Sequence, residues 1–268
     1  MKIFKFFILI FALLGVIGFV SSVLGGCFMD FIPSWESIFE TEFPTGMETS
    51  TEIETSEGDM FSDLTMVCLG DSITMGSEID TPYSQLVGDS LGLKNVYNHG
   101  VGWSTIGFMA DCTCHANVDY EYDHHPYIHR YNKMQNADIV AVMGGNNDWG
   151  IGIPVGDIND MDETTFCGAL NLLIDGLKEK YPDSYIFFMT LFNYVPDRIN
   201  KDGVSWIEYN NAIREICSRK GIDVFDIYNE IPFDKDRDTV DGVHPTQEFV
   251  TNVWSPAITE FIRQNYKK

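Results

Sequence analysis

The stretch Ile139-Val140-Ala141-Val142-Met143-Gly144-Gly145-Asn146-Asn147-Asp148 decides the fold that we expect for this chain. It begins with five apolar residues in a row and ends abruptly in glycine, asparagine and aspartate. An unbroken apolar run of this length is typical of a strand that is covered on both faces, as strands are in a parallel sheet. The change to Gly and Asn predicts a turn at the carboxyl end of that strand.

Four further apolar runs lie along the chain, and helical patterns separate them. This alternation is the signature of βαβ units. We therefore predict a flavodoxin-like three-layer α/β/α sandwich with a five-stranded parallel sheet, whose ligands bind beyond the carboxyl ends of the strands. The predicted strands are Thr65–Leu69, Asn95–Asn98, Ala137–Met143, Ser184–Thr190 and Asp223–Ile227. The predicted helices lie near Pro82–Leu91, Ile128–Asn136, Glu163–Tyr181, Trp206–Lys220 and Gln247–Asn265.

The N-terminus has the parts of a secretory signal. Lys2 and Lys5 precede an apolar stretch, and small residues follow it up to Cys27. Leu24-Gly25-Gly26-Cys27 resembles a bacterial lipobox in which Cys27 would be lipidated, although Gly25 departs from that motif. The stretch is also about as long as a membrane-spanning helix. We interpret residues 1–27 as a signal peptide with a lipobox or as an uncleaved membrane anchor, and either one exports the rest of the chain.

Residues 28–63 are rich in Glu, Ser and Thr and contain no Lys or Arg, which predicts an acidic disordered linker. Residues 64–268 remain as the folded domain. The whole chain has 40 acidic and 17 basic residues, a formal charge of −23. Such a chain repels nucleic acid and anionic lipid headgroups. We therefore exclude nucleic acid as a partner and expect contact with the membrane through the N-terminal anchor only.

Three motifs at predicted strand ends carry hydrolytic chemistry. Ser72 follows the first strand, where a serine can aim its hydroxyl and its own N–H toward one point. Asn147 follows the third strand and can direct its amide at a developing oxyanion. Asp241 and His244 follow the last strand, and their spacing lets the carboxylate hold one ring nitrogen while the other faces the serine. Each motif alone has an ordinary alternative, namely a helix cap, a turn or a surface loop. Because the carboxyl ends of parallel strands share one edge of the sheet, all three motifs would meet there. Such a combination has little structural explanation other than a catalytic site.

In this order the motifs resemble the SGNH (GDSL) hydrolase family over about Leu64 to Ile262. Gly70-Asp71-Ser72 is similar to its first block, Gly145-Asn146-Asn147-Asp148 to its GxND block and Asp241-Gly242-Val243-His244 to its DxxH block. The resemblance implies the α/β/α fold and ester hydrolysis through an acyl-enzyme, with no metal and no cofactor. It implies that Ser72 is the nucleophile, His244 the general base and Asp241 the residue that orients it. The oxyanion hole would use the Ser72 amide and the Asn147 side chain.

One block departs from the family pattern. The second block usually reads Asn-x-Gly-x-x-Gly-x-Thr/Ser, and its second glycine donates an N–H to the oxyanion hole. Here the segment reads Asn98-His99-Gly100-Val101-Gly102-Trp103-Ser104-Thr105, with Trp103 at the position of that glycine. Either Trp103 donates, provided that it can adopt the required φ and ψ, or Gly102 donates after a one-residue shift. Asp71, Trp103 and Trp149 are the predicted substrate contacts.

A Cys/His-rich insert lies between the second and third strands. It contains Asp111-Cys112-Thr113-Cys114-His115, then His124, His125 and His129. Zinc prefers such ligands, but the spacing matches no zinc site that we recognise, and clustered histidines are more often solvated. The six cysteines form no evident disulfide framework, and Cys68, inside the first strand, should be a buried apolar residue. The insert's tyrosines should border the substrate cleft or pack in the core, with equal weight on each: Tyr120, Tyr122, Tyr127 and Tyr131.

These observations predict an extracytoplasmic serine esterase that is tethered to the cell membrane or secreted. An exported and tethered position favours a polymer of the envelope or the environment as substrate, and removal of acetyl groups from a carbohydrate is the first expectation. A lipase or lysophospholipase is the alternative. A non-catalytic carbohydrate-binding module is a third interpretation, which only the Trp103 departure favours. Because fold does not fix function, the substrate rests on the resemblance alone.

Overall fold

The computed structural model describes residues 60–109, 126–194 and 197–267, which all belong to one compact unit that starts at Ile53. The predicted signal or anchor (1–27), most of the predicted linker (28–63) and residues 111–125 of the Cys/His-rich insert lie outside the described residues. Within the described ranges, no helix combines the length and the apolar character that crossing a membrane requires.

The sheet has five parallel strands in the order β2-β1-β3-β4-β5. They are β1 (Thr65–Gly70), β2 (Asn95–Gly100), β3 (Ile139–Met143), β4 (Tyr185–Met189) and β5 (Asp223–Phe225). Gly70 at the end of β1 pairs with Gly100 on one side and Met143 on the other, so the strands end together at one edge. The predicted flavodoxin-like sheet is confirmed, strand by strand.

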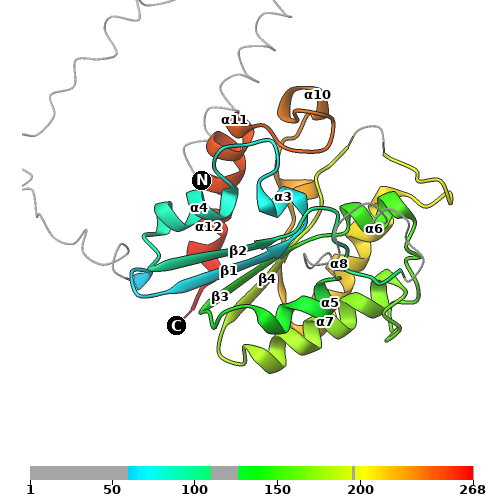
Figure 1. Ribbon diagram of the computed structural model, residues 1–268, viewed down its shortest axis with the longest axis horizontal. Helices are drawn as coiled ribbons and strands as arrows, with labels where there is room; N and C mark the ends of the chain where they lie inside the picture. The colour runs from blue at the N-terminus through cyan, green and yellow to red at the C-terminus, as the bar shows by residue number, and fades with distance from the viewer. Residues whose placement is uncertain (1–59, 110–125, 195–196, 268) are drawn as a thin grey trace, which may run out of the picture. The chain divides into compact units, whose positions relative to one another are not determined.

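Helices cover both faces of the sheet (Figure 1). One face carries α4 (Tyr83–Leu91) and α12 (Ser255–Asn265), which pack together. The other carries α5 (Tyr127–Arg130), α7 (Phe166–Lys180) and α8 (Trp206–Lys220). Several short helices complete the described residues: α3 (Ser72–Met75), η3 (Tyr131–Lys133), α6 (Asn146–Ile151), α9 (Ile227–Glu230), α10 (Lys235–Asp238), α11 (Gln247–Phe249) and η4 (Val250–Trp254).

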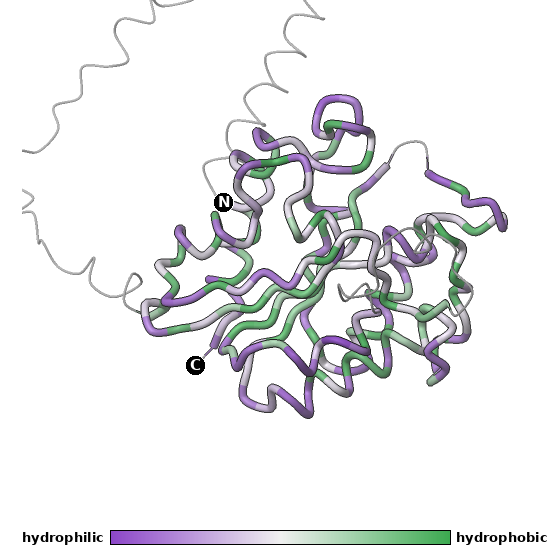
Figure 2. Tube along the Cα trace, in the orientation of Figure 1, coloured by the Kyte–Doolittle hydropathy of each residue, from purple (hydrophilic) through white to green (hydrophobic). Residues whose placement is uncertain are grey.

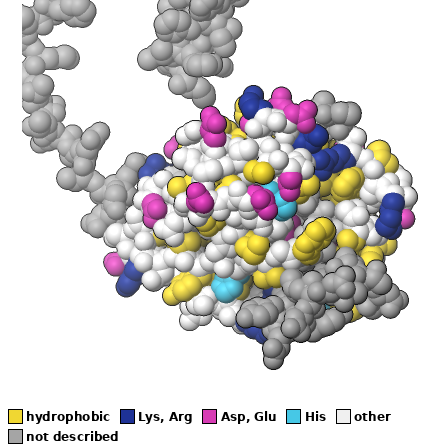
Figure 3. Space-filling model, turned by 45° about the horizontal axis from the view of Figure 1, so that its top comes forward, with side chains coloured by type: hydrophobic (Ala, Val, Ile, Leu, Met, Phe, Trp, Pro, Cys, Tyr) yellow, Lys and Arg dark blue, Asp and Glu magenta, His cyan; other side chains and the backbone are white. Residues whose placement is uncertain are grey.

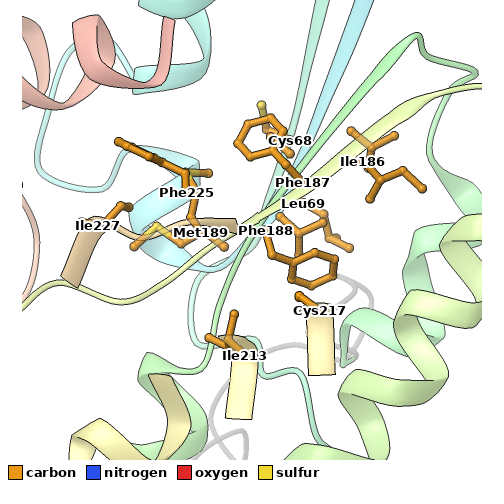
Figure 4. Packing of buried hydrophobic residues seen from close by; sticks show 14 of the residues in the cluster. Cys68, Leu69, Ile186, Phe187, Phe188, Met189, Ile213, Cys217, Phe225 and Ile227 are labelled. Carbon is orange, nitrogen blue, oxygen red and sulfur yellow. The ribbon is translucent and has the colours of Figure 1, made fainter. Parts of the chain in front are cut away.

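The core forms because the central strands are apolar on both faces, as the hydropathy along the chain shows (Figure 2). Every residue of β3 is buried. On β4, Phe187 and Phe188 point to opposite sides, and Ile213 and Cys217 of α8 lie on the side of Phe188 (Figure 4). The Phe187 ring packs 5.3 Å from that of Phe261 in α12. The prediction that Cys68 is a buried apolar residue is confirmed, since its exposed fraction is 0%.

Local signals explain which predicted helices are accurate. Helix α8 matches its predicted bounds because Ser205 and Glu208 form a capping box at its start and Gly221 ends it in a left-handed conformation. The helix predicted over 247–265 is instead divided by the π-helical turn η4. Pro256 stands in the first turn of α12 and has no N–H to donate, so a continuous α-helix cannot run through it.

The helix predicted over 128–136 is also shorter than expected. It comprises α5 and the 3₁₀ turn η3, which ends at Lys133. Arg130, at the junction, has a φ of −128°, which lies outside the helical range. The side chain of this residue proves to be important for the site.

Candidate active site

Ser72 is the first residue of α3, immediately after β1. The side chain of Asp71 caps this helix, its Oδ1 accepting the N–H of Ile73 at 2.9 Å. Helix α3 folds back tightly on the sheet. A side chain at Gly70 would clash with Thr74, and one at Gly100 would clash with the backbone of Met75. Glycine is thus required at both strand ends to place Ser72 at the carboxyl edge of the sheet.

The structure brings Ser72, His244 and Asp241 together. His244 Nε2 lies 2.9 Å from Ser72 Oγ, and His244 Nδ1 lies 2.7 Å from Asp241 Oδ2. The other carboxylate oxygen, Oδ1, accepts the N–H groups of Val243 and His244 at 2.9 and 2.8 Å. Asp241 therefore binds both the imidazole ring and the backbone N–H of His244.

The charge of Asp241 sets the tautomer of His244. Desolvation raises the pKa of Asp241, but hydrogen bonds from the backbone and ring of His244 and from the Val243 N–H outweigh it and lower the pKa to about 2. The carboxylate is therefore ionised at neutral pH and must accept a proton from Nδ1. Nε2 is left with a lone pair facing the Ser72 hydroxyl, which is the arrangement of a general base beside its nucleophile.

Three N–H donors are available for an oxyanion near Ser72. Among the described residues, the backbone N–H groups of Ser72 and Trp103 have no hydrogen-bond partner. The Asn147 side chain donates one N–H to the Ser104 carbonyl at 2.9 Å, which fixes the orientation of the amide because a carbonyl oxygen can only accept. The second N–H of this amide has no partner among the described residues. The arrangement provides the kind of donor set that an oxyanion hole needs.

Trp103 has the backbone conformation of a glycine. Its φ is 65°, in the left-handed region that residues with a side chain rarely occupy. The left-handed conformation falls on Trp103 and not on Gly102. The indole is 63% exposed beside the site. Positive φ at a bulky residue costs free energy, and such strain is typical of functional loops.

Sequence reasoning gave Asp148 no role, yet it anchors the loop that carries Trp103. The residue is completely buried, and its two carboxylate oxygens accept the N–H groups of Gly107 at 2.7 Å and Ile106 at 3.0 Å. Burial raises the pKa of Asp148 to about 7 although both amides lower it. Its position in the GxND block was the only signal of a role. Its partners, Ile106 and Gly107, lie some forty residues earlier in the chain, so the sequence did not indicate them.

Arg130 is the second supporting residue that the sequence did not reveal. It is 5% exposed and reaches the site from α5. Its guanidinium donates to the carbonyls of Gly70 and His99 at 2.5 Å and to Ser104 Oγ at 3.0 Å. Arg130 thus ties the ends of β1 and β2 to the loop after β2.

Two of the predicted substrate contacts, Asp71 and Trp149, make hydrogen bonds within the domain. Asp71 is 1% exposed, and burial raises its pKa to about 6 against the opposing effects of the Ile73 N–H, His244 and Arg130. Trp149 is half-buried, and its Nε1 donates to the Val204 carbonyl at 3.2 Å. The substrate contacts of Asp71, Trp103 and Trp149 stay predictions.

Within the insert, Tyr127 lies in the core, its hydroxyl donating to the Met143 carbonyl at 2.9 Å. Of the two alternatives for this tyrosine, core packing is correct. His129 Nε2 lies 3.0 Å from Glu163 Oε2. Over the described ranges, no group of three or more His, Cys, Asp or Glu residues is arranged to hold a metal ion.

Comparison with known proteins gives two findings. The sequence profile of the GDSL-like lipase/acylhydrolase family matches residues 68–249. No curated protein matches the chain.

Solved structures resemble the domain closely in fold. A protein from Lactobacillus plantarum is 25% identical over 77% of this chain and 99% of its own, with a TM-score of 0.66. A possible lipase from Chitinophaga pinensis is 22% identical over 75% and 98%, with a TM-score of 0.58. A carbohydrate acetylesterase from Sinorhizobium meliloti is 14% identical over 76% and 100%, with a TM-score of 0.54.

Proposed function

Because this chain belongs to the GDSL-like lipase/acylhydrolase family, we propose that it removes short acyl groups, acetyl first, from a carbohydrate or cell-envelope polymer. The family makes the chain a carboxylic ester hydrolase. The proposal adds the substrate class and the roles of individual residues.

One observation supports the roles above all others, namely the continuous hydrogen-bonded series from Asp241 through His244 to Ser72, at 2.7 and 2.9 Å. An ionised carboxylate, an imidazole held in one tautomer and a hydroxyl in line with it can move a proton off the serine as its oxygen attacks.

In the proposed mechanism, Ser72 Oγ attacks the carbonyl carbon of the ester while His244 Nε2 takes its proton. The negative charge that develops on the carbonyl oxygen is stabilised by the N–H groups of Ser72, Trp103 and Asn147. We assign the third donor to Trp103 rather than Gly102, because Trp103 has the left-handed backbone. Collapse of the tetrahedral intermediate breaks the bond to the alcohol, which leaves with the proton from His244. Water then attacks the acyl carbon and gives a proton to the same nitrogen. Collapse of this second intermediate breaks the bond to Ser72 Oγ, which takes the proton back from His244, and the acid is released.

Three observations support a short acyl group on a carbohydrate. A structural neighbour is a carbohydrate acetylesterase, although at 14% identity it shares the fold alone. The chain's charge of −23 opposes binding to anionic lipid surfaces, which a lipase would have to approach. An exposed indole at the mouth of the site can also stack on a sugar ring.

The test is hydrolysis of 4-nitrophenyl acetate, butyrate and laurate by the full chain in mild detergent, beside the Ser72→Ala variant. We expect turnover that falls as the acyl chain lengthens and that drops by about 10⁴-fold or more in the variant. A preference for laurate would favour the lipase alternative. Folded protein without Ser72-dependent turnover on any ester would reject the catalytic function and favour a binding module.

We also propose that the domain acts outside the cytoplasm on an N-terminal tether. The basic start, the apolar stretch and Cys27 support this. Fractionation of bacteria that express the full chain and a Cys27→Ala variant tests it. Membrane association that requires Cys27 indicates lipidation, association without it indicates an uncleaved anchor, and cytoplasmic protein in both would reject export.

A further inference from the structure

We propose that Arg198 and Lys235 form an anion-binding subsite beside the catalytic turn, and that this subsite selects esters whose alcohol part carries a carboxylate. The inference rests on the proposed deacetylation, since an acetyl group leaves the alcohol as the only part of the substrate that can be charged.

Arg198 is fixed against the turn that carries Asp241 and His244. Its Nη2 donates to the Gly242 carbonyl at 2.8 Å. Its guanidinium carbon lies 3.6 Å from the centre of the Tyr194 ring, a cation–π contact, and the Tyr194 hydroxyl donates to the Val243 carbonyl at 3.3 Å. Only Val243 separates Gly242 from His244, so their Cα atoms lie within about 7.6 Å of each other. The cation therefore stands close to the reacting groups.

The charge of Arg198 has no carboxylate partner within 4.0 Å among the described residues. Other arginines of the domain do have such partners. Arg214 forms two hydrogen bonds with Asp226, at 2.9 and 2.8 Å, and Arg219 and Arg237 pair with neighbouring acids. A guanidinium has several N–H groups, and the bond to Gly242 uses one. The guanidinium also lies over the Trp149 and Trp206 rings, at 6.0 and 5.8 Å, and rings leave the N–H groups at its edge available to bind an anion from outside.

Lys235 is a second cation near Gly242. Its Nζ lies 3.9 Å from the point where a Cβ would be if residue 242 had a side chain. Its partner Asp236, at 3.1 Å, is 87% exposed, and an exposed pair of this kind is weak. Gly242 has a φ of 84° and no side chain, so residue 242 itself places no side chain next to Lys235.

The two cations are accessible from solvent. Arg198 is half-buried, and the side chain of Lys235 is 42% exposed. Lys and Arg side chains gather on the same molecular face as a histidine and several acidic residues (Figure 3). A carboxylate that approaches Arg198 meets both attraction and hydrogen-bond donors there, whereas the acidic residues on the same face repel it.

A simpler role for Arg198 would be to brace the catalytic turn. Bracing would help every substrate equally, whereas an anion subsite helps only charged ones. The experiment therefore compares two acetate esters of the same shape, 3-acetoxybenzoate, which is an anion, and 3-acetoxybenzamide, which is neutral. Arg198→Gln removes the charge, Arg198→Lys keeps it, and Arg219→Gln removes one positive charge from α8 as a matched control.

For the full wild-type chain in mild detergent we expect kcat/KM to favour the benzoate by about 5- to 10-fold, mainly through KM. Arg198→Gln should abolish the preference, Arg198→Lys should retain part of it, and Arg219→Gln should leave it unchanged. Raising NaCl from 50 to 500 mM should shrink the wild-type preference, since salt screens exposed charges. Lys235→Gln, which leaves the turn braced, should reduce the preference about 2-fold and provides the test if Arg198→Gln does not fold.

The outcomes separate the two proposals. Hydrolysis of both esters by the wild type without a preference rejects the subsite and leaves the proposed function standing. An equal loss on both esters in Arg198→Gln, with the preference intact, shows a bracing role and also rejects the subsite. No Ser72-dependent turnover of either ester or of 4-nitrophenyl acetate rejects the proposed function, and the subsite with it.

Discussion

The two halves of the site are built in opposite ways. Ser72 and its oxyanion loop rest on buried polar residues, Asp148 and Arg130, which bind backbone groups of three separate segments. Asp241, in contrast, has a side chain that is 46% exposed. Its turn is held by short-range hydrogen bonds and by the side chains of Tyr194 and Arg198. Ser72 is thus held by buried polar groups, whereas Asp241 and His244 lie on a turn that is partly open to solvent.

This difference predicts which substitutions lower activity without lowering the stability of the domain. Substitutions around Ser72 should lower both, because they leave buried groups without partners. Substitutions in the turn should lower activity alone, because water can replace the lost bonds. Four predictions test this contrast, beginning with the largest effect.

Replacing His244 by alanine should lower kcat/KM on 4-nitrophenyl acetate by about 10⁴-fold or more, because no other group can take the Ser72 proton. The melting temperature should stay within about 2 °C of wild type, since the imidazole side chain is partly exposed. Activity assays and thermal unfolding of the same preparation check this. A fall in melting temperature together with the loss of activity would contradict the view that water can replace the hydrogen bonds of the turn.

Asn147→Ala should lower kcat by about 100- to 1,000-fold, the usual cost of one lost oxyanion donor. It should also destabilise the domain, because the Ser104 carbonyl loses its donor. Asn171→Ala is the matched control. Asn171 is 6% exposed and its amide donates to the Ile158 and Asp160 carbonyls, remote from Ser72 in the chain. Equal kcat values in the two variants would exclude an oxyanion role for Asn147.

Asp148→Asn should lower the melting temperature at pH 5 by about 2–10 °C. The hydroxyl oxygen of the protonated carboxyl still has a lone pair for one of the two N–H groups, whereas the amide nitrogen of asparagine has none. The pH dependence follows from the raised pKa of about 7, against an ordinary value of 3.8. Between these values the folded state binds the proton more tightly than the unfolded chain. The contribution to stability is therefore complete below pH 3.8 and is lost as the pH rises through 7.

Asparagine cannot lose that proton, so the difference in melting temperature between wild type and Asp148→Asn should narrow from pH 5 to pH 8. Unfolding curves at these two pH values measure it. A difference that widens with pH would show that the two amides, not burial, dominate the pKa of Asp148.

Trp103 provides the smallest effect and the sharpest comparison within the oxyanion loop. Trp103→Gly should be more stable than Trp103→Ala by about 1 kcal/mol, because only glycine adopts a φ of 65° without strain. Both variants should keep kcat on 4-nitrophenyl acetate within about 5-fold of wild type, since each retains the backbone N–H. Denaturant unfolding and steady-state kinetics are the measurements. A large loss of kcat in Trp103→Gly alone would mean that the strained backbone itself places the donor.

The fold and the triad positions could be predicted because their signals are local. Apolar runs, the Ser205 capping box and the spacing of Asp241 and His244 each lie within a few residues. The roles of Arg130 and Asp148 could not, because their partners are backbone groups supplied by distant segments. The left-handed backbone of Trp103 could not be predicted from its own side chain, which disfavours it. Only the comparison with a glycine-containing block raised the question.

The bond between Ser72 and His244 joins residues 172 positions apart, nearly the ends of the folded domain. Contacts between such distant residues carry the largest loop-closure entropy and tend to form late. During refolding, far-UV circular dichroism should therefore recover before esterase turnover does. Esterase turnover therefore reports the final closure of the chain, which far-UV circular dichroism does not detect.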